Sequence, residues 1–376
     1  MNIFRYFKFI IVFGVSIIIF ACQEQSSQSL SEEKKSKEES IEIEPLNVPA
    51  VNQSQINLEK ITFLKKVGEI KEGFCEEEYN FFDKITGLCI DADNNLYVAD
   101  SGLHKIFKFN NQGKYITLFG SQGQGPGEFL GNLRMSIGND GKLYITDDGN
   151  WRLIIFSKNG KFINQFSLTR YIYDIPLANS REEIYLLSPS GLKIIDIFDS
   201  SFKYRQSLLE MSYQLDFPYQ SPPKSMLNRM TMRPWMMEVK KLLTKEDHLF
   251  VIFNNSQIVV HFDENHKIIK QFRIDHPRFV RDYKIRLKHA ISNGGWVNCF
   301  GSVFFDNNEY LYLCYYNSIL NRPEIYRYQK NGKFVDTLTI RNIKTRSNQI
   351  INVSDNLGNF YGMNDDSNKI IIYQIK

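Results

Sequence analysis

Residues 96–120, LYVADSGLHKIFKFNNQGKYITLFG, carry the pattern that decides the fold. An alternating apolar strand is followed by a polar turn, a second apolar strand, a turn rich in Asn and Gly, and a third strand. Residues 143–167, LYITDDGNWRLIIFSKNGKFINQFS, repeat this order. In both copies 18 residues separate the opening leucine from the lysine that begins the third strand, Lys114 or Lys161. Such constant spacing indicates a repeated structural unit.

Four further copies of this unit follow along the chain. They open at Ile184, Leu249, Leu311 and Phe360. A short additional strand precedes the copies across tight turns that contain Asp, Asn and Gly, residues that tolerate positive φ and bond their own backbone. Four antiparallel strands per unit, repeated radially, form a propeller blade. The sequence therefore predicts an all-β fold, a six-bladed β-propeller.

The sixth copy ends at Lys376 after its third strand, so its outer strand must come from another part of the chain. Residues 61–64 and Val67 have the pattern of a strand, and we expect this N-terminal strand to close the ring. Residues 209–238 are excluded as a seventh blade because they carry four prolines, and proline removes a donor from a β-ladder.

Two stretches resemble the NHL-repeat family, specifically the six-bladed propeller lipoproteins of Bacteroidetes-type bacteria. They are DADNNLYVADSGLHKIFKF at residues 91–109 and GSQGQGPGEF at residues 120–129, the second being similar to the Gly-rich connector of such repeats. The resemblance covers residues 85–376, closely in the first two copies and by pattern in the others. It implies a propeller whose relatives bind proteins, RNA or peptides, while a few related propellers are lyases or lactonases. The resemblance therefore does not select a function.

The N-terminus resembles the signal sequence of a bacterial lipoprotein. Arg5 and Lys8 lie before an apolar run over residues 9–21. This run is too short for a spanning helix, which needs about 20 apolar residues, and fits a signal peptide better. It ends at Cys22, the residue that a lipid would modify. We therefore expect lipid attachment at Cys22.

The segment after the lipid site predicts the domain organisation. Residues 22–57 contain no aromatic residue and are rich in Gln, Ser, Glu and Lys, so we expect a disordered tether. The signal peptide would be residues 1–21 and the propeller residues 58–376. The protein would lie in the cell envelope, attached to a membrane by its N-terminal lipid. Gln23 provides no inner-membrane retention signal, which favours the outer membrane.

The predicted loops are divided unequally between the two faces of the propeller. Turns between strands one and two, and between strands three and four, share one face and are short. Turns between strands two and three share the other face with the connectors between blades. All long insertions belong to this second face: residues 71–84, 120–131, 209–238, 275–300 and 318–324. Long loops on a rigid scaffold usually carry binding, so we expect a ligand there; the alternative is that they plug the central channel.

The candidate ligand-binding residues on that face are His104, Arg134, Trp151, Arg152, Arg229, Trp235 and Trp296. His104 and Trp151 occupy equivalent positions in the turn between the second and third strands. Aromatic side chains beside arginine suit a glycan or a peptide, through stacking and bidentate hydrogen bonds. The alternative for each residue is packing within the fold.

Two further features have both a structural and a functional interpretation. Residues 275–300 predict a helix that begins near Pro277 and stops at Gly294, with basic side chains on its outer side. These basic residues form either a rim that attracts anions or an ordinary solvated face. Asp100 and Asp147 occupy equivalent positions, and we expect them to hold turns.

The residues give little support to catalysis. None of the six histidines lies on a predicted innermost strand, where a channel metal would be held. Asp91, Asp306 and Asp355 lie at short turns, where a structural role is sufficient. The motifs G-x-S-x-G, H-E-x-x-H and C-x-x-C are absent. No catalytic residue, metal site or cofactor is therefore expected.

A net charge of +4 is too small to indicate a nucleic acid partner. We expect a monomeric binding or scaffold protein of the cell envelope whose partner is a protein, a peptide or a glycan. The alternative is a metal-dependent propeller hydrolase or lyase that uses Ca²⁺ or Zn²⁺. Four cysteines besides the lipid site either form a disulfide or remain buried thiols: Cys75, Cys89, Cys299 and Cys314.

Overall fold

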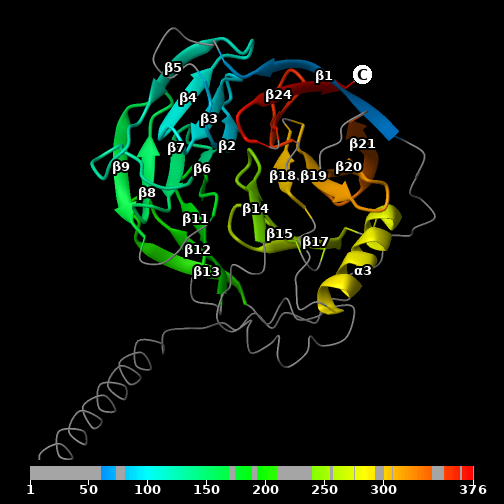
Figure 1. Cartoon of the computed structure of the whole chain (residues 1–376). Coiled ribbons are helices and arrows are strands. Elements are labelled where there is room, and N and C mark those ends of the chain that lie inside the picture. Colours follow the sequence, from blue (N-terminus) through cyan, green and yellow to red (C-terminus); the bar gives the residue numbers. More distant parts are fainter. Residues whose placement is uncertain are drawn as a thin grey trace, which may run out of the picture. The chain divides into compact units, whose positions relative to one another are not determined.

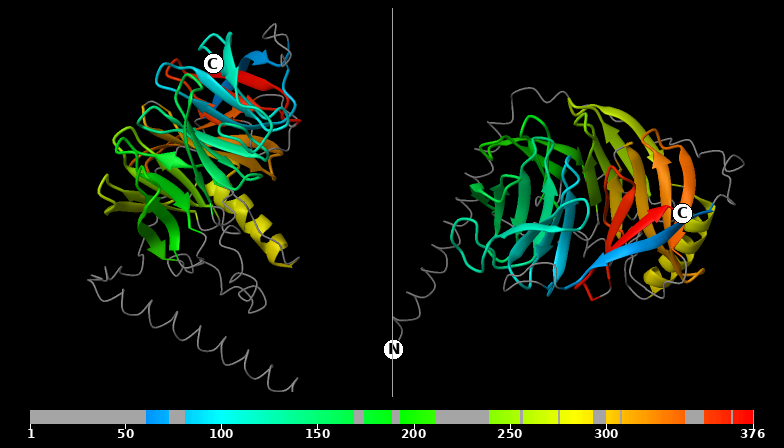
Figure 2. Two further views of the ribbon diagram at one scale, coloured as in Figure 1. Left: turned by 90° about the vertical axis from the view of Figure 1, so that its left-hand side faces the viewer. Right: turned by 90° about the horizontal axis from the view of Figure 1, so that it is seen from above.

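The computed structural model describes residues 61–72, 81–168, 174–188, 193–210, 239–254, 257–274, 276–292, 300–306, 308–340, 351–364 and 366–375. Within these residues, 24 strands lie around a common centre, and the helix α3 (Pro277–Ser292) lies outside them (Figures 1 and 2). No helix in this part of the chain is long and apolar enough to cross a membrane.

The first four units are separate antiparallel sheets whose strands follow chain order. Blade one contains β2 (Ile85–Ile90), β3 (Leu96–Asp100), β4 (Lys105–Phe109) and β5 (Tyr115–Phe119). Blade two contains β6 (Leu133–Ile137), β7 (Leu143–Asp147), β8 (Arg152–Phe156) and β9 (Phe162–Ser167). Blade three contains β10 (Leu177–Ala178), β11 (Ile184–Leu187), β12 (Lys193–Phe198) and β13 (Tyr204–Glu210). Blade four contains β14 (Val239–Leu243), β15 (Leu249–Phe253), β16 (Ile258–Phe262) and β17 (Ile268–Arg273).

The last two units are joined in one eight-stranded sheet. Blade five contains β18 (Ser302–Phe305), β19 (Tyr310–Asn317), β20 (Arg322–Gln329) and β21 (Phe334–Ile340). Blade six contains β22 (Val353–Ser354), β23 (Asn359–Met363), β24 (Ile370–Ile375) and, as its outer strand, β1 (Ile61–Ile70). β1 pairs antiparallel with β24, from Leu64 opposite Ile375 to Ile70 opposite Ile370. The predicted closure by an N-terminal strand is therefore confirmed.

The first residues of β1 also pair in parallel with β21, from Ile61 opposite Thr337 to Leu64 opposite Ile340. No sequence signal predicted this second pairing, which joins the outer edges of blades five and six. Leu64 takes part in both pairings. Its side chain is 3% exposed and belongs to the apolar core between these two blades.

The innermost strands show that the units form a ring. β2, β6, β10, β14, β18 and β22 each contact the next in this order, and β22 contacts β2. Apolar side chains fill the space between neighbouring blades; Tyr97, Phe129 and Ile154 belong to the core shared by blades one and two. The predicted six-bladed β-propeller is therefore the fold.

Short turns and their anchors occupy one face of the ring, here termed the turn face. Asp91 accepts hydrogen bonds from two backbone N–H groups of its own turn and, at 3.0 Å, from the hydroxyl of Tyr97. Two further pairs repeat this arrangement, Asp306 with Tyr312 and Asp355 with Tyr361. The expected structural role of these aspartates is confirmed.

The connectors between blades lie on the opposite face, here termed the connector face. Asp100 is fully buried and accepts hydrogen bonds from four backbone N–H groups of the preceding connector and its own turn. Asp147 bonds the backbone N–H groups of Leu130 and Gly131 in the same way, at 3.1 and 2.8 Å. Both aspartates hold turns, as expected.

Helix α3 begins at the predicted proline and lies beside blade five (Figure 1). Phe279 and Tyr283 are buried in the apolar core that blades four and five share. Residues 318–324 do not form the long loop that we expected, because the insertion lengthens β19 and β20 to eight residues each. Asp282 of the helix accepts hydrogen bonds from the hydroxyl of Ser318 and the backbone N–H of Ile319. The residues that follow the lengthened β19 thus bind helix α3.

Two of the four cysteines can be placed. Cys89 and Cys314 are buried free thiols, and burial raises the pKa of both. Cys75 and Cys299 lie outside the described residues, as do the lipid site, the signal peptide and the tether.

Replacing Leu64 with alanine tests the closure. We expect Leu64→Ala to lower the free energy of unfolding by about 2–5 kcal/mol, because it leaves a cavity in the core between blades five and six. Val67 lies in the same strand with 46% of its surface exposed, so Val67→Ala should change stability by less than about 0.5 kcal/mol. Urea titration of the two variants measures the difference. Equal effects of the two substitutions would contradict a sealed closure.

Candidate functional site

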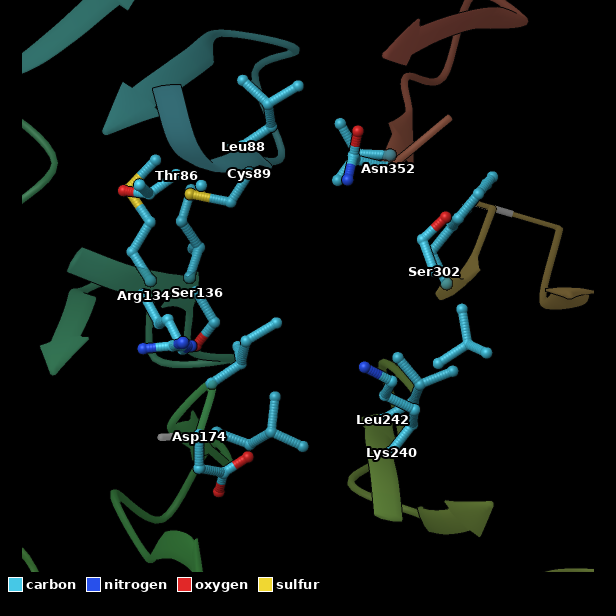
Figure 3. Close-up of a pocket in the computed structure, with 18 of the residues that line it drawn as sticks. Thr86, Leu88, Cys89, Arg134, Ser136, Asp174, Lys240, Leu242, Ser302 and Asn352 are labelled. Carbon is cyan, nitrogen blue, oxygen red and sulfur yellow. The ribbon is translucent and has the colours of Figure 1, made fainter. Parts of the chain in front are cut away.

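A cavity of about 1370 Å³ lies at the centre of the ring. Residues from the innermost strands of all six blades line it. Figure 3 shows side chains around the open space from these strands, among them Thr86, Arg134, Lys240 and Ser302, and from the residues just before two of them, Asp174 and Asn352. Ligand sites in proteins are typically concave and occupy several hundred cubic ångströms. We therefore take this central channel as the candidate site.

The end of the channel nearest the connector face is polar and basic. The innermost strands run from the connector face to the turn face, so their first residues lie at this end. Lys84, Arg134 and Lys240 line it. The ammonium group of Lys84 donates a hydrogen bond to Asn132 Oδ1 at 3.0 Å, and Arg134 Nη1 lies 3.9 Å from Asp148 Oδ2.

The end nearest the turn face is apolar. Ile90, Ile137, Leu243 and Phe305 line it. Ile90, Ile137 and Leu243 each pair with the first residue of the second strand in their blade, and Phe305 pairs with Leu311, the opening residue of its repeat. Because the blades are repeats, this shared register places the four side chains at one level of the channel.

Three blades are tied together beside this apolar end. The side-chain amide of Asn139, in blade two, donates hydrogen bonds to Thr244 O at 2.7 Å and to Asp247 Oδ1 at 2.6 Å, both in blade four. Asp247 also accepts a hydrogen bond from the backbone N–H of Ser180, in blade three, at 2.9 Å. These bonds draw three inner turns together at the turn face, so we take the connector face as the entrance.

A buried ion pair forms one part of the channel wall. Lys241 Nζ lies 2.5 Å from Asp174 Oδ2, and the two side chains are 1% and 8% exposed. Burial lowers the pKa of Lys241, and the Asp174 carboxylate counteracts this shift. Asp174 also accepts a hydrogen bond from the backbone N–H of Leu187 at 2.9 Å. Since β10 has only two residues, this pair gives a short inner strand an additional connection to blade four.

Three of the predicted contact residues lie on the connector face. Arg134 lines the channel. His104 and Trp151 occupy the same turn position in blades one and two, with φ of 55° and 54°. This left-handed conformation is unfavourable for a bulky side chain. Trp151 keeps 40% of its surface exposed. Neither His104 nor Trp151 lines the cavity.

Arg152 has a structural role instead of the predicted contact role. It is 6% exposed. Its guanidinium donates hydrogen bonds at 2.6–3.0 Å to the backbone carbonyls of Gln124, Gly125 and Glu128. The side chain is buried between blade two and the Gly-rich connector, and its hydrogen bonds hold that connector in place. Packing within the fold was the alternative to ligand contact for this residue.

The other predicted residues, Arg229, Trp235 and Trp296, lie outside the described residues. Conversely, the sequence analysis did not identify Lys84, Lys240 or the Asp174–Lys241 pair. A signal was present in the adjacent lysines 240 and 241, which follow Val239 in an inner strand where apolar residues would be expected. The partner of Lys241 had no such signal, because it depends on the neighbouring blade.

Cys89 lines the channel, but burial and the nearby Asp91 raise the pKa of its thiol, so it stays protonated and weakly nucleophilic. Among the described residues, no three His, Cys, Asp or Glu side chains are arranged to hold a metal ion.

Comparison with known proteins supports the fold. Residues 77–140 match a protein family described as a 6-bladed beta-propeller. No curated protein matches the sequence. A putative exported protein from Bacteroides fragilis is 13% identical, with a TM-score of 0.53 over 84% of this chain and 99% of that one. Virginiamycin B lyase from Staphylococcus aureus is 13% identical, with a TM-score of 0.48 over 83% of this chain and 100% of that one. At these identities the similarity concerns the fold, and the chain is a β-propeller scaffold.

The buried ion pair predicts a specific pattern of stability. Asp174→Ala should destabilise the fold by about 3–5 kcal/mol, because it leaves the Lys241 ammonium buried without a counter-charge. The double variant Asp174→Leu/Lys241→Met should recover most of this loss, since an apolar pair needs no desolvation of charge. The exposed pair of Lys158 with Asp93 serves as a control, and Lys158→Met should cost less than about 1 kcal/mol.

Chemical denaturation measures all three variants. A loss below about 1 kcal/mol for Asp174→Ala, similar to that of an exposed pair, would show that the pair does not hold the channel wall.

Proposed function

We propose that the chain is a binding or scaffold propeller of the cell envelope that recognises a peptide, a protein partner or a glycan on its connector face, at the mouth of the central channel. One observation carries this proposal. The innermost strands of all six blades together line a cavity of about 1370 Å³ whose end at the connector face is polar and basic. A rigid ring that presents such a cavity is suited to hold a ligand without rearrangement.

The rest of the proposal comes from the sequence. The apolar run before Cys22 supports export and lipid attachment, and the polar segment after it supports a tether to the membrane, with the outer membrane favoured. The repeats are of the NHL type. We propose that the protein acts as a monomer on partners outside the cytoplasm, where nucleic acids are not available to it.

A ligand screen with variants of each face tests the proposed function. Glycan arrays and pull-downs from envelope extract would use the wild-type chain and the variant Arg134→Ala/Trp151→Ala, which alters the channel mouth and an exposed aromatic of the connector face. We expect this variant to lose at least about tenfold in affinity for the captured ligand, equivalent to 1.4 kcal/mol.

The matched control alters the turn face. Lys158 and Tyr204 are exposed there, Lys158 with 56% of its side chain and Tyr204 with 54% of its surface. Lys158→Ala/Tyr204→Ala should retain the ligand. A ligand that is lost from the turn-face variant and kept by the connector-face variant would overturn the proposed function.

A further inference from the structure

Helix α3 exposes one stripe of side chains along its length. Four exposed residues form it, three of them basic and none acidic: Arg281, Lys284, Ile285 and Lys288. Their spacing of three, one and three residues places them on one side of the helix. Phe279 and Tyr283 attach the opposite side to the core that blades four and five share. The exposed stripe is therefore turned away from the propeller.

The turn between β19 and β20 adds apolar surface beside this stripe. Asp282 accepts a hydrogen bond from the backbone N–H of Ile319 at 3.1 Å, and Ile285 lies about one helical turn beyond Asp282. Ile285, Ile319 and Leu320 are 53%, 45% and 42% exposed. We term the stripe together with Ile319 and Leu320 the α3 patch. Exposed alkyl groups among cationic side chains are typical of helices that lie in a membrane interface.

The charge of this region is positive whichever ion pairs its side chains form. Helix α3 and residues 317–324 contain six arginines and lysines and two carboxylates, which leaves an excess of four positive charges. Arg273 and Asp275, which precede the helix in the sequence, cancel each other. Both carboxylates, Asp282 and Glu324, are fully buried. The surface that α3 presents therefore attracts anions.

The chain enters the described structure beside this helix. Arg278 Nη2 donates a hydrogen bond to Thr337 Oγ1 at 3.3 Å, and Thr337 pairs with Ile61, the first residue of β1. Figure 1 shows β1 beginning next to β21, in the blade beside which α3 lies. In the sequence, 38 residues separate Cys22 from Ile61, a stretch that spans at most about 140 Å. An anchor at Cys22 therefore raises the effective concentration of lipid headgroups at α3.

These features fit one partner. We propose that the α3 patch binds the surface of an anionic phospholipid bilayer, with its basic side chains at the phosphate groups and its apolar side chains at the boundary between headgroups and acyl chains. The inference rests on the proposed function for the attachment of the chain to a membrane. It adds a second contact, which determines the side of the propeller that meets this membrane.

A fluorescent probe on the helix tests the proposal with the full chain attached to vesicles. Ile285→Cys is labelled with a probe whose emission depends on the polarity of its surroundings, and the unsubstituted chain gives the background from native cysteines. Phosphatidylcholine vesicles are compared with vesicles in which about one third of the lipid is phosphatidylglycerol. On the anionic vesicles we expect emission at shorter wavelength and severalfold weaker quenching by aqueous acrylamide, because the label enters the headgroup region.

A label on the turn face is the matched control for position. Leu357 is 58% exposed in a short turn of that face, so its exposure is similar to that of Ile285. The label on Leu357→Cys should show the same emission and the same quenching on both kinds of vesicle.

Charge-removing variants identify the contact. Arg281→Gln/Lys284→Gln/Lys288→Gln, made in the chain labelled at position 285, should abolish the shift on anionic vesicles. The matched control replaces three exposed lysines of the turn face with glutamine: Lys158, Lys161 and Lys203. This control changes the net charge equally and should retain the shift. Raising sodium chloride from about 50 to 500 mM should reverse the shift, because salt screens the attraction. The salt series needs no charge variant, so it remains informative if the triple variant fails to fold.

Equal emission at position 285 on neutral and anionic vesicles would overturn the proposal, as would a shift that persists in the triple variant of α3. A label that acrylamide cannot reach before vesicles are added would also overturn it, since another part of the protein would then cover the patch. Failure of the chain to bind anionic vesicles would do the same. Attachment to neutral vesicles reports the N-terminal anchor alone, so loss of the anchor and loss of the patch give different results. The ligand screen depends on Arg134 and Trp151, which lie outside the α3 patch.

Discussion

The pairing of β1 with β24 is the constraint on which the rest of the structure depends. A propeller is held by contacts between neighbouring blades, and a ring of such contacts is stable when its first and last blades are joined. Here the sixth blade takes its outer strand from the start of the described chain, six residues of which pair with β24. The parallel pairing of β1 with β21 adds a second attachment, so that Leu64 fixes blades five and six at once.

This closed ring determines what the centre can do. The six inner strands are held at a fixed register. Equivalent residues of different blades therefore lie at the same height around a common channel. Arg134 and Lys240 are far apart in the sequence but equivalent in register. The turns of the turn face contain the repeated Asp–Tyr anchors. They also make contacts between blades, such as that of Asn139 with Asp247. The Gly-rich connector of residues 120–131 lies at the other face, as does the polar end of the channel.

The features that could be predicted from the sequence are those repeated in every unit. Period-two alternation, turn residues and the constant spacing before Lys114 and Lys161 depend on local rules, so they determined the blades, the closing strand, the start of α3 and the role of Asp100. The unpredicted features depend on contacts between units. Examples are the parallel pairing of β1 with β21, the ion pair Asp174–Lys241, and the lengthened strands beneath α3. Arg152 is a further example. Its place in the repeat could be predicted, but its hydrogen-bond partners lie in the connector before blade two.

Native-state hydrogen exchange followed by mass spectrometry tests the closure most directly. If β1 is the outer strand of blade six, the backbone amides within residues 64–70 that bond to β24, about every second one, should be as protected as those of β24 and should exchange only when the whole propeller unfolds. Exchange of residues 64–70 within seconds, while β24 remains protected, would show that the ring is closed in some other way. The levels assigned to the central channel would then lose their support.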